Sequence, residues 1–229
     1  MTGLCHKKYL KLTPPTEEDS RSAQVRILDE LSDITDPVQF SMKALRQLSS
    51  VCVNADWEIT VSLSWDGCKW LITNLETGDT SSNLYGLAVD LGSTTVVMQL
   101  LDCISGKVLA QTSVRNHQRD KGLEILSRIF FSKDNPEHLE ELRQLTLKSI
   151  LEGMENLKMH TGIEVHQCGA MVISGNNAMI HFLVGLDPFP IFSSPYAVWA
   201  DQLGFYPAQE LGLPLSCPVY LVPARANYL

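Results

Sequence analysis

The pattern of hydrophobic and polar positions in the first third of the chain predicts a small sheet. From Trp57 to Trp65, apolar and polar residues alternate, which is typical of a strand covered on one face. Asp66-Gly67 is a tight-turn signal, and the following KWLITNL supplies a return strand. Upstream, KKYLKL (residues 7–12) predicts a further short strand. We therefore expect a hairpin and one additional strand in this part of the chain.

Two helices are predicted beside these strands. Thr16 is expected to cap the first helix, with an aspartate three residues later as a weaker capping-box partner. Asp36 is expected to cap the second, with Pro37 at its first position. Residues 1–80 are thus predicted to form a small α+β unit. The polar, turn-rich segment ETGDTSSN (76–83) is the best candidate for a domain boundary.

From residue 84 the pattern changes. YGLAVDL (85–91) is a nearly continuous apolar run, which predicts a strand buried on both faces. VVMQLLD and KVLAQTSV follow it, so the three segments predict a three-stranded meander. Beyond the meander, the pattern predicts a short helix at 122–131, a long helix at 135–160, a strand at 168–175, a helix from Asn176 and a last strand at 217–224. Residues 187–216 are rich in proline and aromatic residues, which predicts an insertion or the edge of a lobe.

Charge and composition exclude several classes of protein. The net charge of −8 disfavours nucleic acid and anionic membrane as partners. No apolar run reaches the length of roughly 18 residues that a membrane helix needs, and the first residues lack the apolar core of a signal peptide. The six cysteines form no Cys-x-x-Cys pair, so we expect buried, reduced thiols. These observations together predict a cytoplasmic protein.

The bend inside AVDLGSTTVVM (88–98) carries the strongest candidate chemistry. Gly92 permits a positive φ and lets a ligand approach the main chain, whose N–H groups favour an anion in such a bend. Ser93, Thr94 and Thr95 add hydroxyl donors for phosphate oxygens. Asp90 cannot bind phosphate directly, but it can hold a hydrated Mg²⁺. The combination predicts a nucleotide–metal site.

The flanking sequence narrows the kind of phosphate site. A P-loop needs a lysine and leads into a helix, and a Rossmann turn needs three spaced glycines. Here the loop has no lysine and leads into a strand, so a phosphate-binding β-hairpin remains. From these residues alone, a simple hairpin turn with local side-chain bonds explains the segment about as well.

A second candidate lies at ISGNNAM (173–179). The predicted strand ends at Gly175, and Asn176 opens a helix whose N-terminus favours anions. For this segment alone, plain helix capping is the better explanation. Its interest is that the junction could face the same cleft as the hairpin.

Other polar residues carry weaker signals. His181 lies one turn into the last predicted helix, and a lone helical histidine belongs more often to the core or the surface than to a catalytic site. RNHQRD (115–120) is expected to be a solvated loop. Glu124 and Arg128 are spaced for a helix salt bridge.

The sequence resembles a known family. YGLAVDLGSTTVV resembles the first phosphate motif of the actin, sugar-kinase and heat-shock-chaperone superfamily. More closely, the chain resembles the reductive activators of corrinoid proteins. The segments that carry this resemblance, in order along the chain, are KKYLKLTPPTEED, LETGDTSSNLYGLAVDLGSTTVV, GLEILSRI, ISGNNAMIHFLVGLDP and VYLVPARANYL.

The resemblance implies a fold and an activity. The implied fold class is α/β: residues 1–80 would be the small α+β middle domain, and residues 84–229 the first part of a ribonuclease-H-like, actin/sugar-kinase-type ATPase domain with a mixed sheet. The family uses ATP to drive electron transfer onto the inactivated corrinoid protein of a methyltransferase system, restoring low-valent cobalt. The implied cofactors are ATP and Mg²⁺. An iron–sulfur cluster is expected only in a ferredoxin domain that these residues lack, and a homodimer is an open possibility.

Carried over to this chain, the family's phosphate and Mg²⁺ contacts fall on the hairpin and the strand-to-helix junction. The residues implied are Asp90, Gly92, Ser93, Thr94, Thr95, Gly175 and Asn176, with Asp90 also in the catalytic role.

The sequence departs from the family pattern at several positions. Ser93 stands where threonine is usual and keeps the hydroxyl, whereas Asn177 and Ala178 replace two threonines. Glu124 stands where aspartate is usual in the family, and Ala224 stands where glycine is usual. The sequence ends where the second phosphate segment is expected, so the resemblance implies an incomplete chain with little or no ATP hydrolysis.

Two other functions stay open from the sequence. One is a non-catalytic module that docks a corrinoid or redox partner through the α+β unit and the aromatic segment 189–206. The other is a small-molecule kinase of the same superfamily, for which no sugar-binding or base residue can be named.

Overall fold

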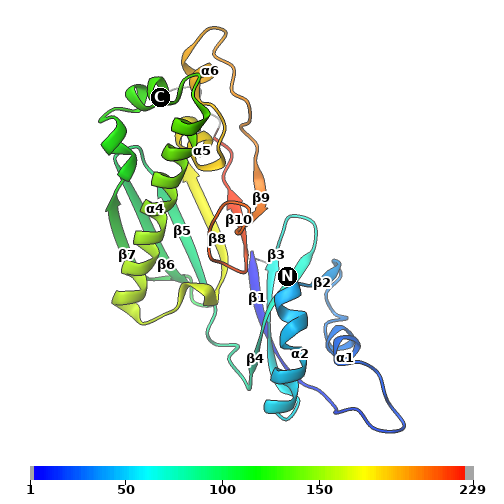
Figure 1. The fold of residues 1–229 in the computed structure, drawn as a ribbon. Helices are drawn as coiled ribbons and strands as arrows, with labels where there is room; N and C mark the ends of the chain where they lie inside the picture. Colours follow the sequence, from blue (N-terminus) through cyan, green and yellow to red (C-terminus); the bar gives the residue numbers. More distant parts are fainter. Residues whose placement is uncertain (1–2, 225–229) are drawn as a thin grey trace.

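The computed structural model describes residues 3–224 and contains two units stacked along one long axis (Figure 1). A four-stranded sheet builds the first unit and a six-stranded sheet the second. Each has its own cluster of buried apolar side chains, one drawn from residues 10–75 and the other from residues 87–221. The last five residues of the segment VYLVPARANYL lie outside the described residues.

The first unit is the predicted α+β arrangement with one additional strand. Its sheet has the order β1-β3-β4-β2, with β2 parallel to β4 and the other pairs antiparallel. Its elements are β1 (Cys5–Lys11), α1 (Ala23–Glu30), β2 (Val38–Phe40), α2 (Met42–Asn54), β3 (Glu58–Trp65) and β4 (Trp70–Thr77). Asp66 closes the predicted turn between β3 and β4, because its Oδ1 accepts bonds from the N–H groups of Cys68 and Lys69.

Both helices begin later than the sequence predicted. Thr16 forms a local turn, in which its Oγ1 accepts from the Asp19 N–H at 3.1 Å, but α1 starts only after Ser22, whose Oγ accepts from Val25. Residues 38–40 after Pro37 form β2 instead of a first helical turn, and Ser41 caps α2. Pairing with β4 decides this second case, since a sheet partner far along the chain outweighs a local capping signal.

The prediction that β3 is covered on one face is wrong. Its polar residues Thr60, Ser62 and Ser64 are all buried. The Thr60 hydroxyl donates to the Gly78 carbonyl at 2.6 Å, and the Ser64 hydroxyl donates to the Gly169 carbonyl of the second unit at 2.7 Å. Of these hydroxyls, that of Ser64 forms part of the contact between the units.

The second unit contains the predicted meander within a mixed sheet of order β7-β6-β5-β8-β10-β9. Strands β5, β6 and β7 are antiparallel neighbours, β5, β8 and β10 run parallel, and β9 is antiparallel to β10. Its strands are β5 (Tyr85–Leu91), β6 (Thr95–Asp102), β7 (Lys107–Arg115), β8 (Cys168–Gly175), β9 (Gly204–Pro207) and β10 (Pro218–Leu221). The aromatic segment thus supplies an edge strand of the sheet.

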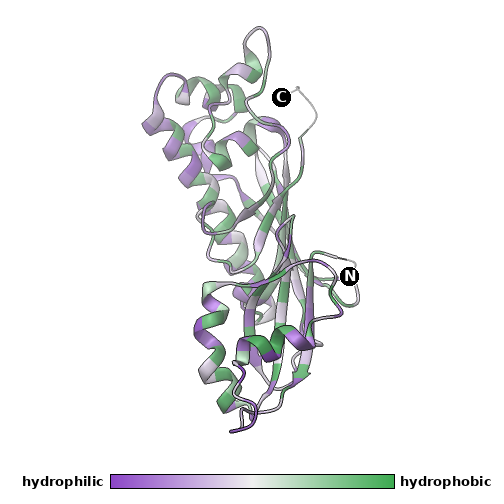
Figure 2. Ribbon diagram, turned by 90° about the vertical axis from the view of Figure 1, so that its right-hand side faces the viewer, coloured by the Kyte–Doolittle hydropathy of each residue, from purple (hydrophilic) through white to green (hydrophobic). Residues whose placement is uncertain are grey.

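The long helix α4 (Pro136–Thr161) packs along β6 and β7. Its buried residues include Leu142, Thr146, Ile150, Met154 and Leu157, which recur every three or four positions and so form the inward face of the helix. At one point the helix backbone comes so close to the sheet that a Cβ on Gly153 would lie 2.3 Å from the Met98 Sδ. The remaining helices are α3 (Ile125–Ser132), α5 (Asn177–Val184) and the short α6 (Phe189–Phe192), with 3-10 turns at His117–Lys121 and Val165–Gln167. Figure 2 shows the helices gathered on one side of the elongated molecule.

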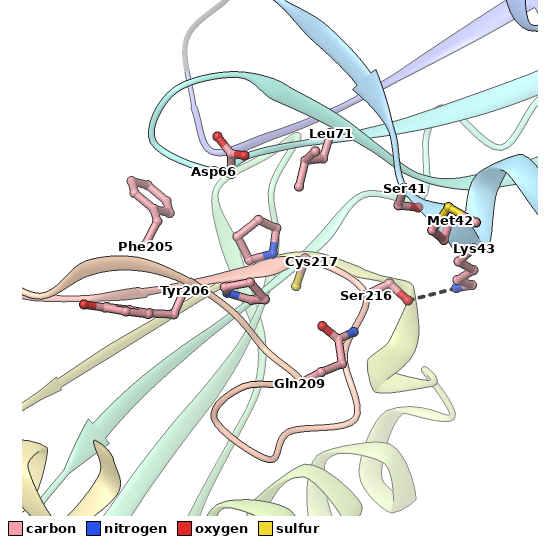
Figure 3. A pocket seen from close by; sticks show the side chains of 12 residues that line it. Ser41, Met42, Lys43, Asp66, Leu71, Phe205, Tyr206, Gln209, Ser216 and Cys217 are labelled. Carbon is pink, nitrogen blue, oxygen red and sulfur yellow. Dashed lines mark hydrogen bonds between the residues drawn. The ribbon is translucent and has the colours of Figure 1, made fainter. Parts of the chain in front are cut away.

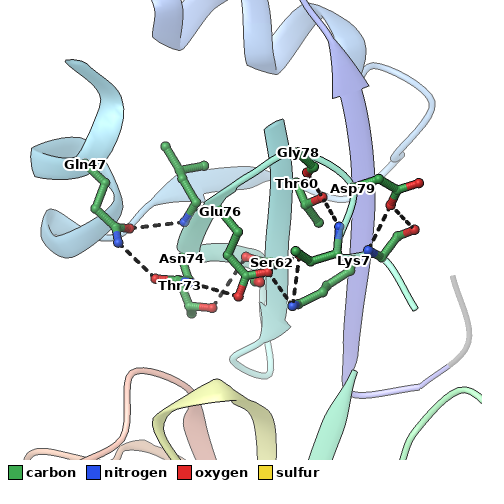
Figure 4. A network of polar contacts seen from close by, with 12 residues as sticks. Lys7, Gln47, Thr60, Ser62, Thr73, Asn74, Glu76, Gly78 and Asp79 are labelled. Atoms are coloured by element: carbon green, nitrogen blue, oxygen red, sulfur yellow. Dashed lines mark hydrogen bonds and ion pairs between the residues drawn. The ribbon is translucent and has the colours of Figure 1, made fainter. Parts of the chain in front are cut away.

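A polar network anchors the chain where it passes from the first unit to the second (Figure 4). The Lys7 ammonium, with 3% of its side chain exposed, pairs with the Glu76 carboxylate at 2.5 Å. The Thr80 hydroxyl bonds the same carboxylate, and the Thr80 N–H donates to Thr60 Oγ1 at 2.9 Å. The segment between the two sheets is thereby tied to β1, β3 and β4.

Within residues 3–224, none of the helices combines the length and the apolar character needed to span a bilayer.

Candidate functional site

The bend between β5 and β6 is held from behind through its carbonyl groups. The carbonyl of Gly92 accepts a bond from Asn116 Nδ2 at 2.9 Å, and that of Ser93 accepts from Arg128 Nη1 at 2.7 Å. The Thr94 carbonyl accepts from the Asn116 N–H at 2.9 Å. Three consecutive carbonyls therefore point into the protein.

This orientation fixes the direction of the intervening N–H groups. In a trans peptide, the N–H of one residue points away from the carbonyl of the residue before it. The N–H groups of Ser93 and Thr94, which follow the Gly92 and Ser93 carbonyls, are consequently directed away from Asn116 and Arg128. Successive amides presented in this way favour an anion. The bend has the backbone polarity that a phosphate cradle requires.

The positive φ predicted for Gly92 is wrong. Gly92 is absent from the described glycines with positive φ. A Cβ at this position would instead lie 2.4 Å from the Thr95 carbonyl oxygen, closer than any side chain can approach. Glycine is required because the chain folds back on itself within three residues.

Asp90 and the hydroxyl residues lie on the accessible side of the bend. Asp90, Thr94 and Thr95 are exposed, and Ser93 is half-buried. The expectation that β5 is buried on both faces is therefore wrong: Leu87, Val89 and Leu91 are buried, whereas Asp90 points to the other, open face. The carboxylate and hydroxyls are available to a ligand, and they are the donor types that Mg²⁺ and phosphate take.

The parallel pairing of β5 and β8 brings the second candidate segment beside the first. Leu91 pairs with Gly175, so the two strands end next to each other. A Cβ on Gly175 would lie 3.0 Å from the Leu91 carbonyl oxygen, which explains the glycine by close strand contact. Asn176 caps α5, with its Oδ1 accepting from the Met179 N–H at 2.9 Å. The N-terminus of α5 and the hairpin bend thus lie at the same edge of the sheet.

Arg128 is the main residue behind the bend, and the sequence did not point to it. Its side chain is fully buried. Besides Ser93, its guanidinium donates to the carbonyls of Gly122 (2.8 Å) and Leu123 (3.3 Å) and to Gln118 Oε1 (3.3 Å). The predicted salt bridge with Glu124 is wrong, because the guanidinium turns inward to neutral oxygen atoms.

The buried guanidinium of Arg128 stays cationic at neutral pH. Burial lowers its pKa to about 10, and the charge of Arg119 adds to this effect. Within residues 3–224, the hydrogen-bond acceptors of Arg128 are all uncharged oxygens, so its positive charge is not neutralised by them. A cation placed directly behind the Ser93 peptide raises the electrostatic potential at the bend and favours an anion on the open side.

The segment 115–120, predicted to be a solvated loop, is solvated only in part: Arg115 and Asp120 are exposed, whereas two amide side chains between them form a buried support. Asn116 and Gln118 are both fully buried. The Gln118 amide donates to Thr146 Oγ1 at 2.7 Å and to the Leu142 carbonyl at 3.1 Å, both on α4. Its own N–H donates to Asn116 Oδ1 at 2.9 Å. The bend is thereby connected to the long helix through two amide side chains, which no local sequence signal distinguishes from solvated ones.

His181 belongs to the core of the second unit. Its side chain is buried, and its Nδ1 donates to the Asn177 carbonyl at 2.7 Å, the direction that a carbonyl acceptor requires. Burial lowers the pKa of the imidazole, against smaller opposing effects of this bond and of Asp187. The histidine is therefore neutral and structural, as one of the sequence-based interpretations had it.

Two cavities lie at the seam between the units, away from the bend. The one in Figure 3 has a volume of about 400 Å³ and is enclosed by the start of α2, the β3–β4 turn and the segment around β9 and β10. Lys43 donates to the Ser216 hydroxyl across it at 3.0 Å. The other, of about 580 Å³, lies between the start of β1 and strands β5 and β8. Of the aromatic segment considered for partner docking, Tyr196 and Trp199 are exposed.

Comparisons with known proteins agree with this architecture. Residues 1–82 match the family described as "RACo linker region", and residues 85–229 match "RACo middle region". A curated relative, "Corrinoid activation enzyme RamQ" of Eubacterium limosum, is 28% identical over 146 residues, which are 64% of this chain and 25% of the relative. A solved structure, "Reductive activator for corrinoid,iron-sulfur protein", is 31% identical with a TM-score of 0.84 and covers 99% of this chain.

The chain spans 36% of the length of that solved structure and a quarter of the curated relative. The matched regions meet between residues 82 and 85, where the two sheets are joined. The family descriptions name the segment before this point the linker and the segment after it the middle region. Because these two matches together cover nearly the whole sequence, the chain belongs to the RACo family of corrinoid activators.

Proposed function

We propose that this chain is the linker and middle region of an ATP-dependent reductive activator of corrinoid proteins. The proposal is supported by its family membership and by the names of the two relatives, which describe corrinoid activation and reductive activation of a corrinoid, iron–sulfur protein. The observation that carries the ATP dependence is the bend at Gly92–Thr95, where Asn116 and Arg128 hold the Gly92 and Ser93 carbonyls and the amides of Ser93 and Thr94 point the opposite way.

The residues present fit a Mg²⁺-bound phosphate group. The amides and hydroxyls of Ser93, Thr94 and Thr95 would bind the phosphates, and exposed Asp90 would hold the hydrated Mg²⁺. The N-terminus of α5, capped by Asn176, would contribute its positive dipole end from the adjacent strand. Mg²⁺ would supply charge neutralisation between the phosphates and the carboxylate.

The structure also suggests how phosphate binding could reach the rest of the protein. The bend is joined through Asn116 and Gln118 to α4, and through Arg128 to the start of α3. A phosphate that displaces the bend would therefore move a connected set of helices. In an activator, such movement is the step that would couple ATP to electron transfer onto the corrinoid.

The phosphate site is tested by titration calorimetry with Mg·ATP and, separately, with Mg·pyrophosphate. Pyrophosphate is included because the candidate residues contact phosphates and metal only. We expect binding of at least one probe to the wild-type chain and a loss of roughly tenfold or more for Asp90→Asn, equivalent to about 1.4 kcal/mol. Glu155→Gln is the matched control, since it removes the same charge from an exposed position on α4.

Two results would count against this function. If neither probe binds, or if Asp90→Asn binds as the control does, the bend is a structural turn and not a phosphate cradle. The corrinoid partner is tested separately, by surface plasmon resonance with an immobilised corrinoid protein in its inactive oxidised-cobalt form. We expect binding that is stronger than binding to the same protein stripped of its corrinoid.

A further inference from the structure

Four of the six cysteines lie at the seam between the two units, away from the candidate phosphate site. Cys5 opens β1, Cys168 opens β8, Cys217 precedes β10, and Cys103 follows β6. Three of them are buried, and Cys103 is exposed, which corrects the expectation that all the thiols are buried. Exposed Cys68 lies apart, on the β3–β4 turn.

Cys5 and Cys103 come from different units and face each other. Both line the cavity of about 580 Å³ at the seam. A Cβ on Gly169 of β8 would lie 2.8 Å from the Cys5 Cβ, and a Cβ on Gly86 of β5 would lie 2.8 Å from the Cys103 Sγ. Gly86 pairs with Ala170, the neighbour of Gly169. The register of β5 and β8 shifts at this point, and both cysteine side chains lie against this pair of strands on the side that faces the cavity.

The chemical states of the two thiols differ in the way that disulfide exchange requires. A hydrogen bond between them lowers the pKa of Cys103 and raises the pKa of Cys5, whose burial acts in the same direction. Cys103 is thus the accessible member that reaches the thiolate form first, and Cys5 is the protected member beside it. Burial raises the pKa of Cys168 and Cys217 as well, and neither of them shares the hydrogen bond that joins Cys5 to the exposed Cys103.

We propose that Cys5 and Cys103 form a thiol–disulfide exchange site that reacts with low-molecular-weight disulfides and closes into a cystine joining the two units. In the first step, the Cys103 thiolate attacks one sulfur of the small disulfide. A mixed disulfide forms on Cys103, the small disulfide bond breaks, and one small thiolate leaves and takes a proton from water. The mixed disulfide removes the hydrogen bond and the charge of Cys103, which both raised the pKa of Cys5. In the second step, Cys5 loses its proton to water and attacks the Cys103 sulfur, releasing the second small thiolate. Two protein thiols are oxidised and one small disulfide is reduced to two thiols.

The new bond would add a second covalent connection between the sheets. In the reduced protein the chain passes between the units once, through residues 78–84. Noncovalent ties such as Ser64 to the Gly169 carbonyl hold β3 near β8 at the same place. A Cys5–Cys103 bond would prevent the first unit from separating from β5 and β8, so the oxidised form would hold the linker fixed on the middle region. A dithiol reductant would reverse it.

The test uses the reduced chain incubated with oxidised glutathione, followed by alkylation and peptide mapping without reduction. We expect a linked peptide pair containing Cys5 and Cys103, and we expect the mixed disulfide on Cys103 to be transient while that on Cys68 accumulates. Cys5→Ser is expected to stop at the mixed disulfide on Cys103, and Cys103→Ser to form no linked pair. Cys68→Ser is the matched control and is expected to form the linked pair at the wild-type rate.

Several outcomes would overturn the proposal. One is a mixed disulfide on Cys103 of the wild-type chain that persists as long as the mixed disulfide on Cys68. This measurement uses only the wild-type chain, so it does not depend on whether a variant folds. Another is a linked pair that joins Cys103 to Cys68 or to a second molecule. Limited proteolysis within residues 78–84 checks the consequence: the oxidised chain is expected to keep its two halves together after cleavage until a reductant is added. None of these readouts involves nucleotide, so a failure here is distinct from a failure of the phosphate site.

Discussion

Replacement of Arg128 by methionine tests whether this buried cation holds the candidate phosphate bend. Methionine keeps most of the apolar stem and removes the guanidinium, leaving the carbonyls of Ser93, Gly122 and Leu123 and the Gln118 amide oxygen without this donor. The two short bonds, of 2.7 and 2.8 Å, come from a charged donor and contribute about 1.5–3 kcal/mol each. The two bonds of 3.3 Å contribute less.

An opposing term reduces this sum. Removing a buried charge also removes its desolvation cost, which is several kcal/mol for an ion taken out of water. The low pKa of Arg128 shows that this cost is present in the folded protein. We therefore expect a net loss of about 2–4 kcal/mol in the free energy of unfolding, which a domain of ordinary stability survives. Arg128→Lys can satisfy one of the two short bonds, so its loss is expected to be about half.

The assay is urea denaturation followed by far-ultraviolet circular dichroism. Tryptophan fluorescence is the second probe, because three of the four tryptophans lie in the first unit and report mainly on it. We expect Arg128→Met to shift the dichroism transition and to leave the fluorescence transition nearly unchanged. Arg115→Met is the control: this side chain is 55% exposed and pairs with Asp120 at the surface, so its loss is expected to stay below about 1 kcal/mol. A loss for Arg128→Met no larger than for Arg115→Met would refute the reasoning.

Three further predictions concern other parts of the structure. Gly92→Ala is expected to destabilise the second unit by roughly 2 kcal/mol or more, because the added Cβ would meet the Thr95 carbonyl at 2.4 Å. Calorimetric unfolding measures this loss. Gly106→Ala is the control: its Cβ meets nothing within 4 Å, so only the positive φ is expected to cost free energy, about 1 kcal/mol. Ser64→Ala leaves the Gly169 carbonyl without this hydrogen-bond donor. It is expected to lower the free energy of unfolding by about 1–3 kcal/mol and to speed amide hydrogen exchange at the start of β8. Ser50 is exposed, so Ser50→Ala should change neither quantity. The pKa of His181 in the folded protein lies below its ordinary value of 6.5, so the unfolded chain takes up the proton first, and the free energy of unfolding is expected to fall as the pH drops below about 6.5. In urea titrations at several pH values, His181→Gln should weaken this dependence. An unchanged dependence of the free energy of unfolding on pH would contradict the assignment.

Much of the second unit could be predicted from sequence because its signals are local. The three apolar segments after residue 84 have strand length and are separated by turn residues, and the meander follows from them. Asn135 followed by proline, with apolar residues every three or four positions, defines α4, and the structure confirms both the cap and the buried face. The bend at DLGSTT was likewise predicted from the order of its residues between two apolar segments.

The supports of the candidate site depended on contacts across the fold. Gly92 looks like a residue chosen for positive φ, but the position of the Thr95 carbonyl decides why no side chain fits there. Arg128 looks like a surface partner of Glu124, yet its bonds reach the bend, the segment before α3 and Gln118. No periodicity encodes such partners, because they are separated by many residues along the chain.

The sequence by itself determined which segments become strands and helices in the second unit and where the bend between β5 and β6 falls. The tertiary structure decided that both faces of β3 are covered, where α1 and α2 begin, what holds the bend and which cysteines meet at the seam. The physical reason is range: periodicity, turn residues and caps act over a few neighbouring residues. Burial, hydrogen-bond partners and sulfur contacts are set by elements that meet only after the two sheets have formed and packed together.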